Sequence, residues 1–372
     1  VIGNCMQTEN SLKTQQQFAY ALPTLGIFFL IGPLSLMHGI YTTYFGVTLS
    51  AMAAVLLTAN LFDAISDPVI GYLSDCQHAR SGSRKGFVLT GGLLFIVSSY
   101  FLFVPVSPES VNASTHVSTG YLLVCYLAFF LSYTLFNIPH MAWASDLAIT
   151  PNETTRIFGW RLSMVASGGL LFYLVPFLPI FETTEFTPQV LEFTALASVF
   201  IIAPALAICL RVAPKKTSIE SRRNHSIISA VDSSLRLSHL IENKPLLLFL
   251  LSFLFYGLTV GTFWALSFIF VNSYLGLGES YALVIVCYTL TVILFAKVWV
   301  LAFVWLSRPI IWALGLGLAV IGISMIAFLQ PEDNSLIMLL IPYILLGCGF
   351  AAGELVAPAI LSDIVDYHEL KF

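Results

Sequence analysis

The feature that most limits how this chain can fold is a succession of apolar segments, each about 20 residues long or longer. A segment of that length crosses a bilayer as an α-helix, which satisfies its own backbone hydrogen bonds in lipid. The sequence predicts ten such helices, near residues 18–45, 48–75, 86–106, 119–146, 156–180, 189–211, 245–273, 280–304, 309–330 and 335–362. Charged residues make up only 10% of the chain, against about 25% in soluble domains, which excludes a soluble globular protein. We therefore expect an all-α, polytopic membrane protein.

The basic residues of the predicted connections lie on one side of the membrane. The connections without any Lys or Arg are residues 107–118, 181–188, 274–279 and 331–334. Cytoplasmic loops carry the excess of Lys and Arg, so both ends of this chain are predicted to be cytoplasmic. The polar residues before the first helix lack a cleavage pattern and are expected to form a cytoplasmic leader rather than a signal peptide. We expect the protein in the plasma membrane, most simply a bacterial inner membrane.

One long polar segment, residues 212–244, divides the chain. We expect it to be a cytoplasmic linker between a six-helix bundle at 1–211 and four helices at 245–372. Ser145-Asp146 and Ser362-Asp363 end predicted helices that lie six helices apart. This weak repeat indicates a six-plus-six duplication, so about ten of an expected twelve spans are in this chain. The basic residues of the linker suit anionic lipid better than nucleic acid, and no nucleic-acid partner is expected.

Two carboxylates, Asp63 and Asp67, lie inside one of the apolar segments. Their i, i+4 spacing puts them on one helix face. Each carboxylate at membrane depth costs on the order of 2.5–3.5 kcal/mol, and the two repel each other, so a bound cation or a proton is needed to compensate them. Pro68 leaves the carbonyl of Ala64 without its helical partner, which adds a possible oxygen ligand. The alternative is that the pair forms salt bridges to a neighbouring helix and serves only packing.

Three motifs resemble the glycoside-pentoside-hexuronide:cation symporters, the melibiose-permease-like branch of the major facilitator superfamily. They are Asp-Ala-Ile-Ser-Asp-Pro-Val-Ile-Gly-Tyr-Leu-Ser-Asp at 63–75 with the basic run to Lys85, Tyr-Thr-Leu-Phe-Asn-Ile-Pro at 133–139, and Ser-Asp-Ile-Val-Asp-Tyr-His-Glu-Leu-Lys at 362–371. The resemblance implies major-facilitator-type helical bundles and symport of a sugar with Na⁺ or H⁺. It also implies that the coupling ion binds to Asp63, Ser66, Asp67 and Thr134, with Asp63 and Asp67 as the ligands of Na⁺.

The resemblance implies a substrate site at Asn137, Met141, Arg161 and Glu354. Of these, only Arg161 is the residue that the melibiose permeases carry. Asn137 stands in place of a carboxylate, and Met141 and Glu354 stand in place of two indoles. Without the indoles the stacking platform for a sugar ring is lost. The expected substrate is therefore a small polar solute such as a sugar or glycoside rather than a galactoside in particular.

Acids and bases also gather at the predicted cytoplasmic ends of the helices. We expect them to form a cytoplasmic gate, whose acidic and basic side chains make ion pairs when the protein is closed toward the cytoplasm. Its residues are Asp75, Arg80, Arg84, Asp146, Asp363 and Asp366, with Arg156 as a further partner. His140 lies in an apolar helix and is either a proton relay or a hydrogen-bonded packing residue.

The leading interpretation is a cation-coupled secondary transporter that works by alternating access, as a monomer. The runner-up is a lysolipid carrier of the same superfamily, since a cavity without indoles could hold an acyl chain. A third hypothesis is a membrane sensor that does not transport. An enzyme is not expected, because the sequence shows no nucleophile elbow, metal-ligand spacing or phosphate loop. No cofactor is expected besides the coupling ion, Na⁺ or H⁺, and the expected partners are the small-molecule substrate and the bilayer.

Overall fold

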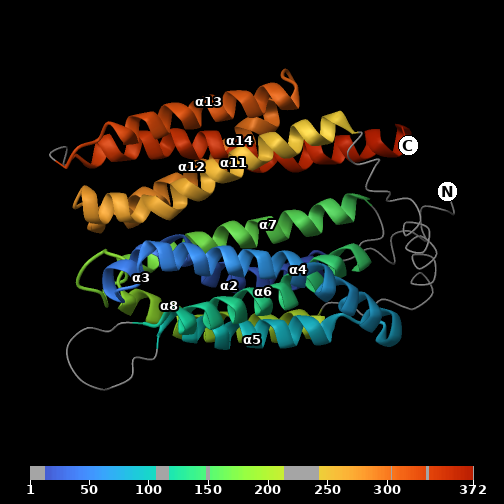
Figure 1. Ribbon diagram of the computed structural model, residues 1–372. Coiled ribbons are helices and arrows are strands. Elements are labelled where there is room, and N and C mark those ends of the chain that lie inside the picture. The colour runs from blue at the N-terminus through green and yellow to red at the C-terminus, as the bar shows by residue number, and fades with distance from the viewer. Residues whose placement is uncertain are drawn as a thin grey trace. The chain divides into compact units, whose positions relative to one another are not determined.

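A computed structural model describes residues 13–105, 117–147, 151–212, 243–302, 304–331 and 335–371. All regular structure in these ranges is helical (Figure 1). Ten helical segments of the described chain are long and apolar enough to cross a membrane. The predicted all-α, polytopic fold is therefore confirmed. The chain forms two compact units: one holds the described residues up to Val175 together with 186–212, and the other holds 176–185 and the described residues from Asn243 onward.

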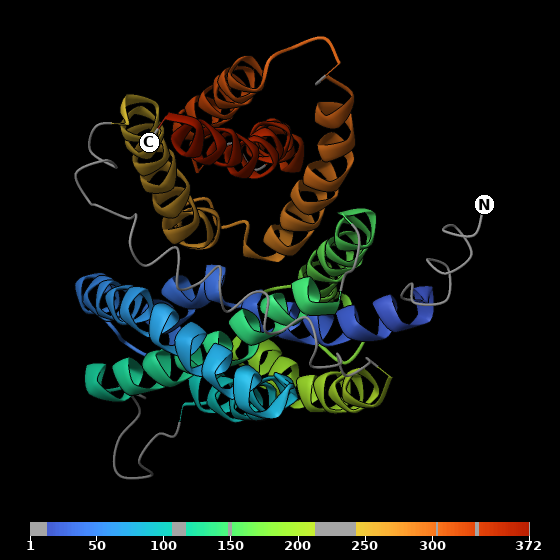
Figure 2. The ribbon, with the colours of Figure 1, turned by 90° about the vertical axis from the view of Figure 1, so that its right-hand side faces the viewer.

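The first unit is a bundle of seven α-helices in which α2 and α6 occupy the centre of the packing. Its helices are α2 (Thr14–Ile31), α3 (Leu34–Tyr44), α4 (Leu49–Ser81), α5 (Lys85–Phe103), α6 (Thr119–Leu147), α7 (Pro151–Leu174) and α8 (Pro188–Val212), and a 3₁₀ turn at Val175–Phe177 follows α7. Helix α2 packs against α7 and α8, whereas α6 packs against α4 and α5, and α5 also contacts α8. Figure 2 shows these helices from the end of the bundle. Helix α6 also contacts α7, so it brings residues of α4 and α7 that lie far from it in the sequence close to its own.

The first membrane span is interrupted, although the sequence predicted one helix over 18–45. Helix α2 ends at Ile31 and α3 begins at Leu34, so the break falls at Gly32-Pro33. Proline has no backbone N–H and cannot continue the hydrogen-bond ladder. A Cβ at Gly32 would overlap the ring of Phe172 on α7, so only glycine lets the two helices approach at this point.

Helices α5 and α6 touch through their backbones. A Cβ added at Gly91 of α5 would overlap the backbone nitrogen of Phe136 on α6. The missing side chain lets the two helices approach closely, which is a common way of packing helices where lipid gives no hydrophobic drive for association. This contact lies beside Thr134 and Asn137, so it helps to fix the part of α6 that carries them.

The second unit contains four long helices. They are α11 (Lys244–Ile269), α12 (Gly278–Ala302), α13 (Arg308–Ala327) and α14 (Leu336–Lys371), and a π-helical turn at Phe270–Tyr274 extends α11. Helix α14 contacts each of the other three. Its closest neighbour is α13, where Gly349 faces the backbone oxygen of Gly315. Helix α14 is therefore the core of this unit, and the sequence did not indicate the π-helical turn.

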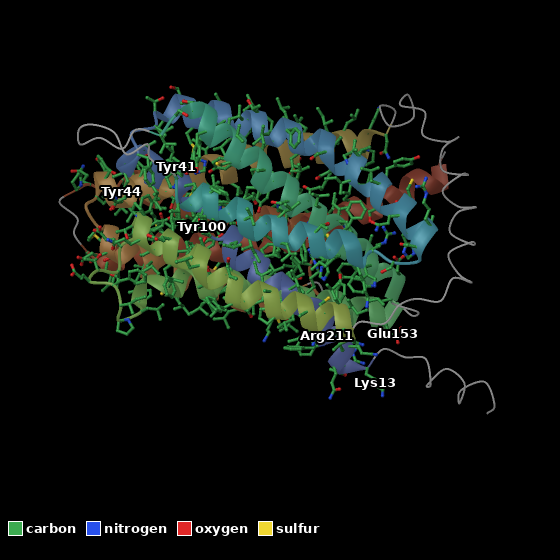
Figure 3. The ribbon with its side chains drawn as sticks, turned by 90° about the horizontal axis from the view of Figure 1, so that it is seen from below. Lys13, Tyr41, Tyr44, Tyr100, Glu153 and Arg211 are labelled. Carbon is green, nitrogen blue, oxygen red and sulfur yellow. The ribbon has the colours of Figure 1, made fainter. Side chains whose placement is uncertain are left out.

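The two ends of the first unit differ in chemistry. In Figure 3, Lys13, Glu153 and Arg211 lie at one end of the unit, and Tyr41, Tyr44 and Tyr100 lie at the opposite end. We refer to the end with Lys13 and Arg211 as the basic end. Charge asymmetry of this kind is what the positive-inside rule uses, and the cytoplasmic assignment of this end stays a prediction.

Candidate functional site

Three oxygen atoms meet between α4 and α6. The hydroxyl of Thr134 on α6 lies 2.9 Å from Oδ1 of Asp63 and 2.9 Å from Oδ1 of Asp67, both on α4. The two carboxylate oxygens can therefore lie no farther apart than twice that distance. Thr134 is buried, and both acids are partly exposed. The structure thus brings together three of the four residues that the resemblance implied for the cation, and we name this group the oxygen cluster.

The fourth residue, Ser66, makes a different contact. Its hydroxyl donates a hydrogen bond to the backbone carbonyl of Asp63 at 3.2 Å, within α4. This is the usual arrangement of a serine that bonds back to its own helix. Ser66 is buried next to the oxygen cluster on α4, and its hydroxyl oxygen keeps its lone pairs while its hydrogen is donated.

The oxygen cluster has fewer hydrogens than it has contacts. One hydroxyl carries one hydrogen, so Thr134 can donate to only one of the two carboxylates at a time. The second contact needs either a proton on a carboxyl group or a cation that the oxygens share. Carboxylate and hydroxyl oxygens are the donors that hard cations prefer. Among the described residues no group of three or more His, Cys, Asp or Glu side chains is placed to hold a metal ion.

A polar pair between α6 and α7 lies one turn along α6 from Thr134 of the oxygen cluster. Arg161 of α7 donates a hydrogen bond from Nη2 to the side-chain oxygen of Asn137 on α6. Nε of Arg161 is buried and has no hydrogen-bond partner among the described residues. A buried N–H without a partner costs about 1–3 kcal/mol, which a ligand oxygen would relieve. Asn137 is three residues after Thr134, so the pair and the cluster share one helix face.

The remaining predicted substrate residues are Met141 and Glu354. Met141, one turn after Asn137 on α6, is 39% exposed and contributes an accessible apolar surface. Glu354 lies on α14 in the second unit, where its side chain is exposed. Its place as a substrate residue stays a prediction, because it belongs to a different unit from the Asn137–Arg161 pair.

Arg84 holds the basic end of the first unit together. Its Nε donates to Oδ2 of Asp146 at 2.8 Å, and its Nη1 lies 2.7 Å from Oδ1 of Asp75 and donates to the hydroxyl of Ser74 at 2.8 Å. His78 adds a contact of 3.6 Å to the same carboxylate oxygen of Asp146. Arg84 is buried and Asp75 is half-exposed, so this partly solvated network joins the C-terminal parts of α4 and α6.

The other predicted gate residues behave differently. Arg80 is exposed and forms no ion pair within the part of the chain that the structure describes. Arg156 donates a weak hydrogen bond of 3.3 Å to the hydroxyl of Thr14 rather than to an acid. The side chains of Asp363 and Asp366 lie outside the described residues.

His140 is a packing residue in this structure. It is fully buried, and its Nε2 lies 2.9 Å from the backbone oxygen of Tyr20 on α2. The phenol of Tyr20 donates in return to the backbone oxygen of His140, and the two rings stack at 4.2 Å. These reciprocal contacts join α2 to α6 just after Pro139. The sequence could not indicate Tyr20 as the partner, because the two residues are 120 positions apart.

Lys85 has a structural contact that sequence reasoning missed. Its ammonium donates to the backbone oxygen of Leu210 at 2.6 Å and lies 5.5 Å from the centre of the Trp143 ring. A cation at the last carbonyls of a helix is favoured by the helix dipole. Lys85 therefore binds the end of α8 to the start of α5, whereas the sequence placed it only in a basic loop.

Comparison with known proteins identifies the family of this chain. A family model described as "MFS/sugar transport protein" matches residues 18–372. The putative glycoside/cation symporter YagG of Escherichia coli (strain K12) is 30% identical over 131 residues, which is 35% of this chain and 27% of that protein. The uncharacterized symporter YjmB of Bacillus subtilis (strain 168) is 24% identical over 98% of this chain and 78% of its own length. The chain spans about a quarter to a third of the length of the first curated relatives it matches.

A solved structure supports the fold. The crystal structure of a D-xylose-proton symporter superposes with a TM-score of 0.61 over 96% of this chain and 88% of that chain, at 14% sequence identity. At that identity the likeness concerns the fold alone. The family model, by contrast, covers nearly the whole sequence. This chain therefore belongs to the MFS/sugar transport protein family.

Proposed function

We propose that the protein is a cation-coupled symporter that carries a small polar solute of the sugar class across the plasma membrane, a bacterial inner membrane, with Na⁺ or H⁺ as the coupling ion. The observation that carries the proposal is the oxygen cluster, in which one hydroxyl contacts two carboxylates at 2.9 Å. Such a cluster inside a membrane span needs a positive charge, and a transported cation or proton supplies it.

The Asn137–Arg161 pair is the first unit's part of the proposed substrate site. The free Nε–H of Arg161 is a donor for a hydroxyl or an acidic oxygen of the solute. The printed names of the curated relatives include a glycoside/cation symporter, a glucuronide carrier homolog and a putative sulfoquinovose importer. All three names describe sugars or sugar derivatives, which fits a site with hydrogen-bond donors and a positive charge.

The two parts of the site are coupled through α6. Thr134 contacts the acids, and Asn137, one turn later, contacts Arg161. An ion that draws Thr134 and the two carboxylates together also fixes the turn of α6 that presents Asn137. Cation binding and substrate binding then stabilise the same position of α6, so each raises the affinity for the other.

The coupling ion competes with protons for the same oxygens. If Na⁺ is the ion, its affinity falls as the pH is lowered, because a proton on either carboxylate removes a ligand. If the proton is the ion, uptake follows a pH gradient and is independent of Na⁺. Measuring uptake with each gradient imposed separately distinguishes the two cases.

The test is accumulation of a panel of neutral and acidic sugars in vesicles that contain the whole protein. We expect an imposed Na⁺ or H⁺ gradient to drive accumulation, and Asp63→Cys or Asp67→Cys to abolish the stimulation while some substrate binding remains. Glu192→Gln is the matched control, because Glu192 is an exposed acid on α8 outside the cluster. Gradient-driven accumulation that survives in both aspartate variants would overturn the proposal. Uptake of lysolipid but of no sugar would favour the carrier alternative, and no uptake or counterflow of any kind would favour the sensor.

A further inference from the structure

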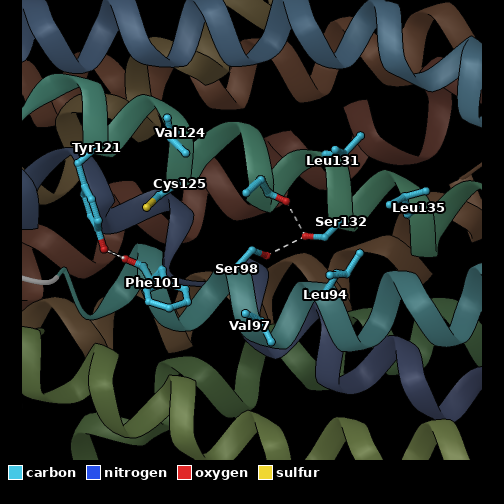
Figure 4. Close-up of a pocket in the computed structure, with 11 residues that line it drawn as sticks. Leu94, Val97, Ser98, Phe101, Tyr121, Val124, Cys125, Leu131, Ser132 and Leu135 are labelled. Carbon is cyan, nitrogen blue, oxygen red and sulfur yellow. Dashed lines mark hydrogen bonds between the residues drawn. The ribbon is translucent and has the colours of Figure 1, made fainter.

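A long apolar groove lies between α5 and α6 (Figure 4). Its volume is about 430 Å³, and it lies wholly within the first unit. Leu94, Val97 and Phe101 line it from α5, and Val124 and Leu131 line it from α6. Between 36% and 65% of the surface of these five side chains is exposed. The oxygen cluster and the Asn137–Arg161 pair contribute nothing to its lining.

The few polar groups in the groove already have partners. The hydroxyls of Ser98 and Ser132 lie 2.7 Å apart, and Ser132 also donates to the backbone oxygen of Ala128 at 2.7 Å. The phenol of Tyr121 donates to the backbone oxygen of Phe101 at 2.7 Å, as Figure 4 shows. An occupant therefore needs no hydrogen-bonding group, and a polar solute such as a sugar would lose its own hydrogen bonds there. The groove favours a hydrocarbon.

The dimensions of the groove restrict the occupant further. From Tyr121 to Leu135 it follows α6 for about 21 Å at 1.5 Å per residue, which is most of the roughly 30 Å hydrocarbon core. A groove of that length along the span can take one extended hydrocarbon chain.

One end of the groove lies at the level of the membrane interface. Tyr121 lines this end and is the third residue of α6, and α5 ends nearby at Phe103. From there the groove runs toward Leu94 and Leu135 in the middle of the span. A molecule with its polar head at the interface can therefore lay its tail along the groove.

We propose that this groove is a binding site for one acyl chain of a membrane phospholipid, held more persistently than the lipid around the rest of the protein. The groove has a defined floor, made by the hydrogen-bonded Ser98–Ser132 pair at the contact of α5 and α6. Because the surrounding lipid is equally apolar, the preference comes from shape and from the many contacts that a concave surface makes with one chain.

The test uses the whole protein in phospholipid vesicles that contain a phospholipid with a photoactivatable diazirine in the middle of one acyl chain. After irradiation and digestion, mass spectrometry locates the inserted label. We expect several-fold more label on residues 94–101 and 121–135 than on the exposed face of α8. Ala128→Leu fills the groove from its lining and should remove this excess, whereas Ala203→Leu adds the same group at an exposed position of α8 and should not.

Val124→Trp provides a second variant that narrows the mouth of the groove, in case Ala128→Leu does not fold. Equal labelling of α5, α6 and α8, or an excess that both Ala128→Leu and Val124→Trp leave unchanged, would overturn the proposal. Preferential labelling of the groove by a photoactivatable sterol, with loss of the acyl label, would also overturn it. The result does not depend on symport, because labelling is measured without a substrate or an ion gradient.

Discussion

Replacing Thr134 by Val removes one hydroxyl and keeps the shape of the side chain. That hydroxyl contacts both carboxylates of the oxygen cluster at 2.9 Å, so it is the atom that makes them one site. A hydrogen bond to a charged group contributes about 1.5–3 kcal/mol. Since about 1.4 kcal/mol corresponds to a tenfold change in affinity, we expect the concentration of Na⁺ needed for half-maximal uptake to rise about 10- to 100-fold.

The assay is initial uptake into vesicles as a function of Na⁺ concentration at fixed pH, repeated as a function of pH without Na⁺. Thr134→Ser keeps the hydroxyl. In whichever of these two measurements shows that the ion drives uptake, its ion concentration at half-maximal uptake should stay within about threefold of the natural value. Substrate binding at saturating cation should change much less than the cation dependence. If Thr134→Val had the same cation dependence as the natural protein in both arms, the oxygen cluster would not be the coupling site.

Three further variants test the geometry around the cluster. Arg161→Lys keeps the charge but loses the planar guanidinium that reaches Asn137. Substrate affinity in equilibrium binding should therefore fall by about tenfold, while the cation dependence of uptake stays the same. An unchanged substrate affinity would exclude Arg161 from the substrate site. Arg84→Lys cannot make the contacts of Nε and Nη1 together, so it should lower the melting temperature by at least about 3 °C. The control Arg80→Gln should leave the melting temperature nearly unchanged. Equal shifts in the two variants would contradict the network. Gly91→Ala should destabilise the protein by about 1–3 kcal/mol in thermal unfolding, because the new methyl group overlaps the backbone of α6. The control is Gly120→Ala. Gly120 has open space around it, so this variant should be as stable as the natural protein.

The helices could be predicted because the membrane leaves few alternatives for a long apolar segment. Ten apolar runs became ten helical spans, and the i, i+4 spacing of Asp63 and Asp67 put both acids on the face of α4 that meets α6. The break at Gly32-Pro33 was missed, although the dipeptide is a known helix breaker, because the apolar run continues through it. Apolarity predicts that a segment spans the membrane but not that it is a single straight helix.

The contacts between helices could not be predicted from residue spacing. The arginine that pairs with Asn137 was indicated only by the family resemblance, since nothing in the local sequence joins α6 to α7. The Tyr20–His140 contacts and the bond from Lys85 to Leu210 depend on which helices are neighbours and at what height they cross. Side-chain hydrogen bonds within a helix could not be predicted either, as Ser66 illustrates by donating to the backbone carbonyl of Asp63.

The central claim is that the ion at the oxygen cluster and the solute beside Arg161 bind cooperatively through α6. The most direct measurement is calorimetric titration of the whole protein with the transported sugar, with and without saturating coupling ion, and the reverse titration with the ion. The account predicts that each ligand raises the affinity for the other by the same factor, about 5- to 150-fold, and that Asp67→Asn reduces this factor to one. Sugar affinity that is the same with and without Na⁺, and at every pH, would contradict the account.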